Sequence, residues 1–103
     1  MVRFVVLYPQ PTDVAAFEQH YFEIHIPLVK KLPGLRNYTV SRNPTPIRGG
    51  APYYQIAEMD WSDMASLQQG FASPMGHEAG RDVGKLLELC PGIHSMVFEL
   101  DAV

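Results

Sequence analysis

The sequence predicts an α+β fold in which two helical regions cover one face of a four-stranded antiparallel sheet. β-Branched and aromatic runs alternate with segments of helical spacing in the order βαββαβ. Proline and glycine stand at most boundaries between these segments, where they interrupt regular structure. The length of 103 residues, with 47% hydrophobic and 18% charged residues, is that of a single folded domain over residues 1–103.

The first strand is expected over residues 2–8, where the run VRFVVLY is rich in β-branched and aromatic residues. Pro9 and Pro11 end this strand because proline cannot donate a hydrogen bond to a neighbouring strand. Large apolar side chains occupy both alternating sets of positions in the strand, so both faces of the sheet need a cover.

The first helical region begins after Thr12 or Asp13, either of which can accept a hydrogen bond from a free amide of the first turn. Apolar side chains then recur at spacings of four, three and four residues, which predicts one buried helical face. This apolar stripe consists of Phe17, Tyr21, Ile24 and Leu28. His20 lies at one margin of the stripe and is expected to face solvent.

Pro27 interrupts this helical region. It lacks an amide proton and clashes with the preceding turn, so we expect the helix to stop or kink near residues 24–26. A second short helix would then run over residues 27–31, because proline is well tolerated at the first helical position. His25 would lie at this joint, at the other margin of the apolar stripe.

The second and third strands are expected over residues 35–41 and 52–60, and the fourth over residues 93–100. The loop of residues 42–51 holds two prolines and two glycines and is longer than a usual hairpin loop. Loops of this kind are often lids over a site, or are disordered. Both interpretations remain open.

The second helical region is expected in two pieces, residues 63–72 and 74–89. Ser62 can cap the first piece, and Ser73 caps the second with a proline at the first helical position. In the second piece a glycine recurs every fourth residue, at Gly76, Gly80 and Gly84, and each costs roughly 1 kcal/mol relative to alanine. The glycines allow either a close backbone approach to the sheet or room for a ligand between helix and sheet.

Together these elements predict the ferredoxin-like βαββαβ arrangement. The helices cover one face of the sheet only, although the first and third strands carry large apolar side chains on both faces. The simplest cover for the second face is the sheet of a second copy, related by a two-fold axis. The sequence therefore predicts a homodimer formed through the sheet face.

Several sequence blocks, once placed on these elements, are similar to those of a known family. They are Tyr8-Pro9 before Pro11, residues 17–21, HIPLV at residues 25–29, LPGL at residues 32–35, and Tyr53-Tyr54. Over nearly the whole chain these blocks resemble the EthD family, which is named for a protein associated with bacterial ethyl tert-butyl ether degradation. The H-x-P-L-V block followed by L-P-G-L is the most specific part of the resemblance. It implies the dimeric α/β barrel superfamily and a homodimer.

The resemblance implies two alternative functions. Similar fungal domains include dehydratases and decarboxylases of aromatic polyketides, and other dimeric α/β barrels isomerise lactones, cyclise polyketides or oxygenate them without a cofactor. One alternative is therefore a cofactor-independent lyase or isomerase that acts by acid/base chemistry on a hydrophobic aromatic or polyketide-like carbonyl compound. The other is a non-catalytic accessory or small-molecule-binding protein of an oxidative degradation pathway. Haem-degrading relatives use an asparagine on the first strand, and residues 2–8 contain none.

His25 is the candidate catalytic acid/base, because it matches the histidine of the family's H-x-P block and because histidine titrates near neutral pH. Removal of a proton beside a carbonyl also requires a hydrogen-bond donor to the enolate oxygen. The candidate substrate-binding residues are Tyr21, Tyr38, Tyr53 and His94. Alternatively, His25 only caps the broken helix and the tyrosines are core aromatics with satisfied hydroxyls.

The sequence argues against a metal site. On a helical wheel His20 and His25 are about 140° apart, so they cannot share a metal ion as an i, i+4 pair can. Cys90 stands without a neighbouring histidine and is no zinc signature, and His77 is expected to face solvent. A glycine-rich phosphate loop and a dinucleotide fingerprint are also missing. We therefore expect neither a metal nor a cofactor.

Composition also limits the partners. A net charge of −3 and a pI near 5.7 argue against nucleic acid, which binds basic surfaces. The sequence contains no apolar run long enough for a membrane span and no signal-peptide pattern. The single cysteine excludes an internal disulfide, which is compatible with a reducing cytosol. We expect a soluble cytoplasmic protein whose partners are a second copy of itself and a hydrophobic small molecule.

Overall fold

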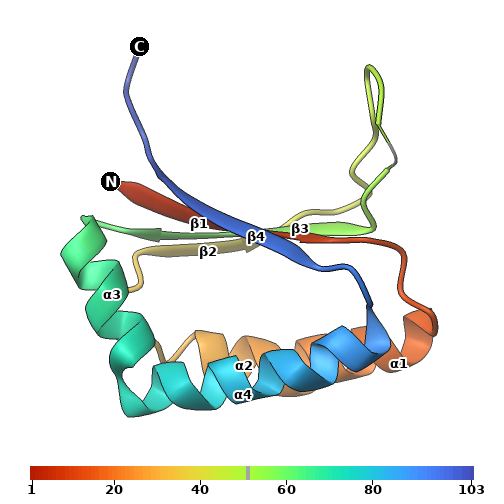
Figure 1. Cartoon of the computed structure of the whole chain (residues 1–103), viewed down its shortest axis with the longest axis horizontal. Helices are drawn as coiled ribbons and strands as arrows, with labels where there is room; N and C mark the ends of the chain where they lie inside the picture. Colours follow the sequence, from red (N-terminus) through yellow and green to blue (C-terminus); the bar gives the residue numbers. More distant parts are fainter. Residues whose placement is uncertain (51) are drawn as a thin grey trace.

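The computed structural model describes residues 1–50 and 52–103. Its elements are β1 (Val2–Tyr8), α1 (Val14–His20), the π-helix η1 (Tyr21–His25), α2 (Ile26–Val29), β2 (Asn37–Val40), β3 (Gln55–Trp61), α3 (Met64–Ala72), α4 (Pro74–Leu89) and β4 (His94–Glu99). The four strands form one antiparallel sheet in the order β2-β3-β1-β4. All helices lie on the same side of this sheet (Figure 1). The predicted α+β, ferredoxin-like fold class is confirmed.

The strand boundaries differ from prediction mainly where the chain turns. β1 covers the predicted residues, whereas β2 runs only from Asn37 to Val40, two residues later at its start than predicted. β3 begins at Gln55, three residues later than predicted, and continues to Trp61. The predicted loop of residues 42–51 includes Ala51, which lies outside the described residues.

The core lies between the helices and the sheet. Along β1 and β3 the side chains that face the helices are paired across the two strands, and this layer contains Val2, Val6, Tyr8, Ala57, Met59 and Trp61. All of these side chains are buried. Alternation along the strands sends the intervening residues to the opposite side of the sheet.

That opposite side, which we call the open sheet face, is partly apolar, and no helix of the described residues covers it (Figure 1). It carries Arg3, Val5, Leu7, Ile56, Glu58, Asp60, Met96 and Phe98. Met96 is 49% exposed and Phe98 is 39% exposed. The charged residues on this face are paired with one another, because Arg3 contacts Asp60 at 2.8 and 3.0 Å and Glu58 at 2.8 Å. The hydrogen bond from Arg3 lowers the pKa of Asp60.

The first helical region is interrupted near residues 24–26 as predicted, but by a wide helical turn rather than by a stop. Asp13 caps α1 through the amide of Ala16. After α1 the helix widens into the π-helix η1, in which the amide of Ile26 bonds to the carbonyl of Tyr21 five residues earlier. Pro27 then lies in the first turn of α2, which ends before the predicted limit of residue 31. The wide turn accommodates proline without ending the helical path.

The π-helix also changes which side chains are buried. The buried residues now recur every four positions, at Phe17, Tyr21, His25 and Val29. Ile24 is 48% exposed, so its predicted place in the apolar stripe is wrong. His25 is only 6% exposed and occupies the buried face itself, rather than its margin.

In the second helical region Asp63, rather than Ser62, caps α3, and Ser73 caps α4 as predicted. A Cβ atom added to Gly76 would lie 2.3 Å from the backbone oxygens of Gly70 and Phe71. The close approach at Gly76 is therefore between α4 and α3, not between α4 and the sheet. Within the described part of the chain, no helix is both long and apolar enough to cross a membrane.

Candidate active site

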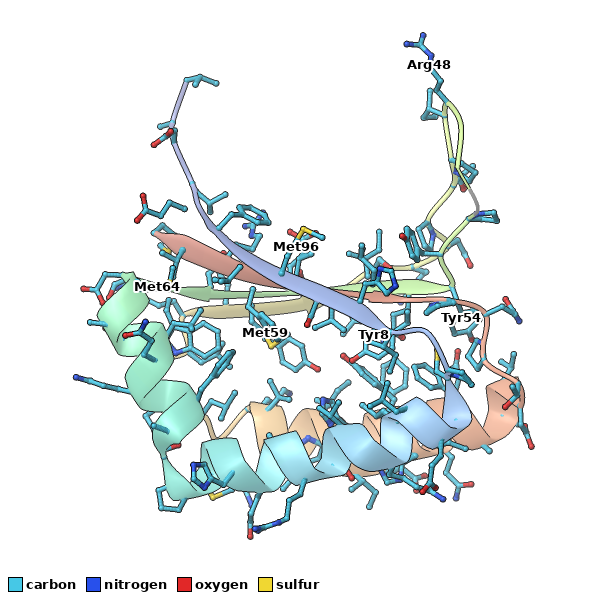
Figure 2. The ribbon with its side chains drawn as sticks, viewed as in Figure 1. Tyr8, Arg48, Tyr54, Met59, Met64 and Met96 are labelled. Atoms are coloured by element: carbon cyan, nitrogen blue, oxygen red, sulfur yellow. The ribbon has the colours of Figure 1, made fainter. Side chains whose placement is uncertain are left out.

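A cavity of about 410 Å³ lies between the sheet and α4. Most of its lining is apolar and comes from β1, β3, α2, α4 and β4. The polar side chains among the lining residues are Tyr8, His25, His77 and Ser95. Figure 2 shows Tyr8 and Met59, both of which line the cavity, on the side of the sheet that faces the helices. The volume lies within the range of small-molecule sites.

Gly80 contributes to the open space at this cavity. It lines the cavity, and a Cβ atom added there would meet no other atom within 4 Å. Of the two interpretations of the glycine pattern, room for a ligand therefore fits Gly80. Gly84 is equally uncrowded but is not one of the lining residues.

A carboxylate on α4 connects two histidines of the first helical region. His25 Nδ1 lies 2.9 Å from Asp82 Oδ2, and His20 Nε2 lies 2.7 Å from Asp82 Oδ1. His20 is partly buried by this contact, so the prediction that it faces solvent is wrong. Because a carboxylate can only accept, Nδ1 of His25 carries a hydrogen and Nε2 of the neutral ring keeps its lone pair.

The protonation state of His25 follows from its surroundings. Burial lowers the pKa of His25 below its ordinary value of 6.5, while the hydrogen bond to Asp82 and the charge of Asp82 oppose this shift. The net shift is downward, so His25 is mainly neutral at neutral pH. A neutral imidazole with one fixed hydrogen is suited to accept a proton.

Three tyrosines lie in the core next to His25 and are connected through Tyr21. The Tyr21 and Tyr38 hydroxyl oxygens lie 2.7 Å apart. The ring of Tyr21 contacts the rings of both Tyr8 and His25, with centroid distances of 5.5 and 5.3 Å. Burial raises the pKa of Tyr38 to about 12 and that of Tyr8 and Tyr21 above the ordinary value of 10. All three hydroxyls therefore stay protonated at neutral pH and can donate hydrogen bonds.

The other candidate residues lie elsewhere. Tyr53 is exposed beside the loop after β2 and does not line the cavity. His94 is paired with Leu7 and points to the open sheet face, whereas its neighbours Ile93 and Ser95 line the cavity. His77, which was expected to face only solvent, does line the cavity. Of the predicted site residues, the structure brings together His25, Tyr21 and Tyr38.

Comparison with known proteins identifies the family. The model of the EthD domain matches residues 9–89. The chain belongs to the EthD family. A crystal structure of an EthD family protein from Bacillus halodurans is 37% identical, covers 98% of this chain and 99% of its own, and has a TM-score of 0.85. An uncharacterised 11.0 kDa protein encoded in the thcB-thcC intergenic region of Rhodococcus erythropolis is 34% identical, and the match covers 81% of each chain.

More distant structures share the fold of this EthD protein. SnoaB, a cofactor-independent oxygenase from Streptomyces nogalater, is 20% identical, with a TM-score of 0.72 and coverage of 99% of this chain and 94% of its own. Others, at 21% identity or less, are dimeric proteins with a ferredoxin-like fold.

The sequence blocks that resemble EthD proteins have identifiable places in the structure. The HIPLV block carries His25 at the end of η1 and Pro27 in α2. In the LPGL block the carbonyl of Pro33 accepts a hydrogen bond of 2.9 Å from Trp61 Nε1. A Cβ atom on Gly34 would lie 3.2 Å from Trp61, so this turn packs closely on the end of β3. The two blocks thus position the histidine and close the adjoining core.

The loop after β2 does not cover the cavity. In Figure 1 it extends from the sheet on the side opposite to the helices, and Figure 2 places Arg48 near its tip. No residue of this loop is among those that line the cavity within the described chain. The described geometry therefore gives no support to a lid at this site.

The described residues contain no group of three or more histidine, cysteine, aspartate or glutamate side chains that could hold a metal ion. Cys90 is buried, its Sγ lies 3.1 Å from the carbonyl oxygen of Pro9, and burial raises its pKa. A raised pKa keeps the thiol protonated and therefore a poor nucleophile or ligand.

Proposed function

We propose that this EthD protein is a cofactor-independent lyase or isomerase that moves a proton on a hydrophobic aromatic or polyketide-like carbonyl compound. His25 is the catalytic acid/base. The observation that carries the proposal is the His25–Asp82 hydrogen bond of 2.9 Å at the wall of an apolar cavity. A histidine that only filled core space would not need a partly buried carboxylate as its hydrogen-bond partner.

The proposed step follows from the state of the His25 ring. With Nδ1 hydrogen bonded to Asp82, Nε2 accepts a proton from the carbon beside the substrate carbonyl. The carboxylate then stabilises the positive charge that forms on the ring. The same ring returns the proton at another position or to a leaving group, which gives isomerisation or elimination.

The apolar lining determines the substrate class. Few polar side chains face the cavity, so the substrate is held mainly by burial of apolar surface. The fold similarity to the cofactor-independent oxygenase SnoaB supports the idea that this fold accommodates chemistry without a bound cofactor.

The alternative is a protein that binds a hydrophobic compound for an oxidative pathway without changing it. The scarcity of polar groups in the cavity favours this alternative, because binding alone needs no base. The two functions differ in one observable property, the exchange of protons next to the carbonyl of a bound compound.

Catalysis and binding alone can be distinguished with 2-tetralone, a bicyclic ketone, in D2O. In this solvent enolisation replaces the protons beside the carbonyl by deuterium. The wild-type protein is expected to accelerate this exchange, followed by proton NMR. His25→Ala should lower the catalysed rate about 100-fold or more, as expected for loss of a general base. His94→Ala is the matched control, since His94 points to the open sheet face and does not line the cavity, and it should stay near the wild-type rate.

Binding of 2-tetralone without any catalysed exchange would support the binding protein instead. Exchange at the wild-type rate in His25→Ala would show that His25 is not the base. Binding is measured by isothermal titration calorimetry on the same samples.

We further propose that the protein is a homodimer formed through the open sheet face. Its apolar side chains, including Val5, Met96 and Phe98, lack a helical cover. Several proteins of this fold are dimeric, which supports the proposal. The charges of this face are already paired within one subunit, so a second copy can cover them without leaving an unpaired charge.

A further inference from the structure

Proton removal by His25 leaves negative charge on the carbonyl oxygen of the substrate, and the cavity must supply a donor for it. Tyr21 and Tyr38 are not among the lining residues, so neither can be assigned this role directly. Tyr8 is the tyrosine that lines the cavity, and it is not one of the residues predicted for the site.

The position of Tyr8 is fixed by backbone and aromatic contacts. Tyr8 ends β1, and its carbonyl accepts a hydrogen bond of 2.8 Å from the amide of Tyr54. Its ring meets Phe17 and Tyr21 edge to face, with centroid distances of 5.4 and 5.5 Å. The side chain is therefore held by its ring, while its hydroxyl is the only part that can form a directional contact with a ligand.

Tyr21 connects Tyr8 to the proposed base. The ring of Tyr21 contacts Tyr8 on one side and His25 on another, and both Tyr8 and His25 line the cavity. The Tyr21 hydroxyl lies 2.7 Å from that of Tyr38, so the ring of Tyr21 is held at both ends. The ring contact with Tyr21 in turn limits how far the Tyr8 side chain can move.

We propose that the Tyr8 hydroxyl donates the hydrogen bond that stabilises the enolate oxygen during proton removal by His25. In this step the C–H bond beside the carbonyl breaks, the proton moves to Nε2 of His25, and the electron pair forms a C=C bond. The negative charge passes to the carbonyl oxygen, which accepts the hydrogen bond from Tyr8. The assignment rests on the proposed function, and Tyr21 acts as a positioning residue.

The first test is Tyr8→Phe, which keeps the ring and removes only the hydroxyl. Exchange of 2-tetralone should fall about 100-fold or more in kcat, as for the loss of an oxyanion donor. Tyr54→Phe is the matched control, because its hydroxyl donates to Glu18 and it does not line the cavity. It should exchange at the wild-type rate. Thermal unfolding of both variants verifies that they are folded.

The second test is binding, which does not depend on turnover. The probe is 2-naphthol, whose oxygen occupies the place of the enol oxygen, and naphthalene is the probe without oxygen. Tyr8→Phe should weaken 2-naphthol binding about tenfold, the loss expected for one hydrogen bond, and leave naphthalene binding unchanged. Tyr21→Phe should lower kcat for exchange less than Tyr8→Phe does, with KM unchanged.

The outcomes separate the two proposals. Wild-type exchange by Tyr8→Phe, or equal affinity loss for both probes, would overturn the assignment of Tyr8 while leaving His25 as the base. If the wild-type protein has no exchange activity and Tyr8→Phe weakens only 2-naphthol binding, the proposed catalysis is overturned. Tyr8 then remains the residue that recognises the ligand oxygen.

Discussion

The carboxylate of Asp82 affects both the orientation and the basicity of the His25 ring. Each of its two oxygens contacts one histidine, at 2.9 Å for His25 and 2.7 Å for His20. His20 therefore holds the carboxylate in the orientation that His25 requires. The carboxylate also limits the loss of basicity that burial imposes on His25. The result is a neutral base that a nearby negative charge can stabilise once it is protonated.

The direction of the His25 pKa shift predicts the pH profile of exchange. Activity requires neutral His25, so the rate should rise with pH and reach its plateau with a midpoint below 6.5. Asp82→Asn should shift this midpoint further down, because the charge that favours the protonated ring is lost, and should lower the plateau. Exchange of 2-tetralone measured between about pH 4 and 8 tests both effects. A wild-type midpoint above 6.5 would contradict the burial argument.

The folding stability of the protein should also depend on pH through the titration of His25. Unfolded His25 titrates near 6.5, while the folded ring titrates lower, so between these values the unfolded chain binds more protons. The contribution of neutral His25 to stability is therefore complete above pH 6.5 and decreases as the pH falls toward the folded pKa. Urea unfolding across this window should show less of this decrease in His25→Ala.

Sequence reasoning could predict His25 but not its carboxylate partner. His25 stands in the recognisable HIPLV block, whereas Asp82 is 57 residues away and has no pattern that connects it to a histidine. Tyr8 could have been found, because it alternates with Phe4 and Val6 on the face of β1 that must meet the helices.

At the scale of elements, the π-helix η1 decides where His25 points. The apolar pattern favoured regular α-helical spacing, with Ile24 buried and His25 at the edge. The structure instead buries His25 against Tyr21 and Asp82 and leaves Ile24 at the surface. Tertiary contacts thus outweigh the apolar pattern in deciding which side chains are buried. A π-helix adds one residue to a turn, and the spacing of apolar residues does not predict it.

Substitution by alanine should have opposite effects on stability at two glycines of α4. Gly84→Ala should stabilise the protein by roughly 0.5–1 kcal/mol, because alanine favours helix and its Cβ meets no atom within 4 Å. Gly76→Ala should destabilise it, since its Cβ would lie 2.3 Å from backbone oxygens of α3. Urea unfolding of both variants measures the change. Equal signs for the two substitutions would refute the described approach of α3 and α4.

At the scale of the whole molecule, the element order was sufficient to predict the arrangement of the sheet and its helical layer. The turns were less predictable, because strand ends at Asn37 and Gln55 depend on local backbone bonds rather than on apolar pattern. The open sheet face followed from large apolar residues on both sides of β1. What covers that face in solution is a separate question from the fold.

The proposed homodimer is tested on this face. Met96→Glu should convert the dimer to a monomer, because a charge would be buried between two sheets. Leu87→Glu is the control, since Leu87 is similarly exposed, at 45%, but lies on α4 on the other side of the molecule. Analytical ultracentrifugation gives the mass of each. A monomeric wild type, or loss of the dimer in Leu87→Glu, would contradict an interface at the open sheet face.

The strand order has a consequence for how the protein is made. β1 lies between β3 and β4, so it needs a partner that leaves the ribosome only after α4 has been synthesised. Until then one edge of β1 is unpaired, and the wall formed by Ile93 and Ser95 is missing from the cavity. A nascent chain therefore exposes the surface of the proposed binding cavity until β4 joins the sheet, and the proposed ligand would meet the complete cavity only from that point on.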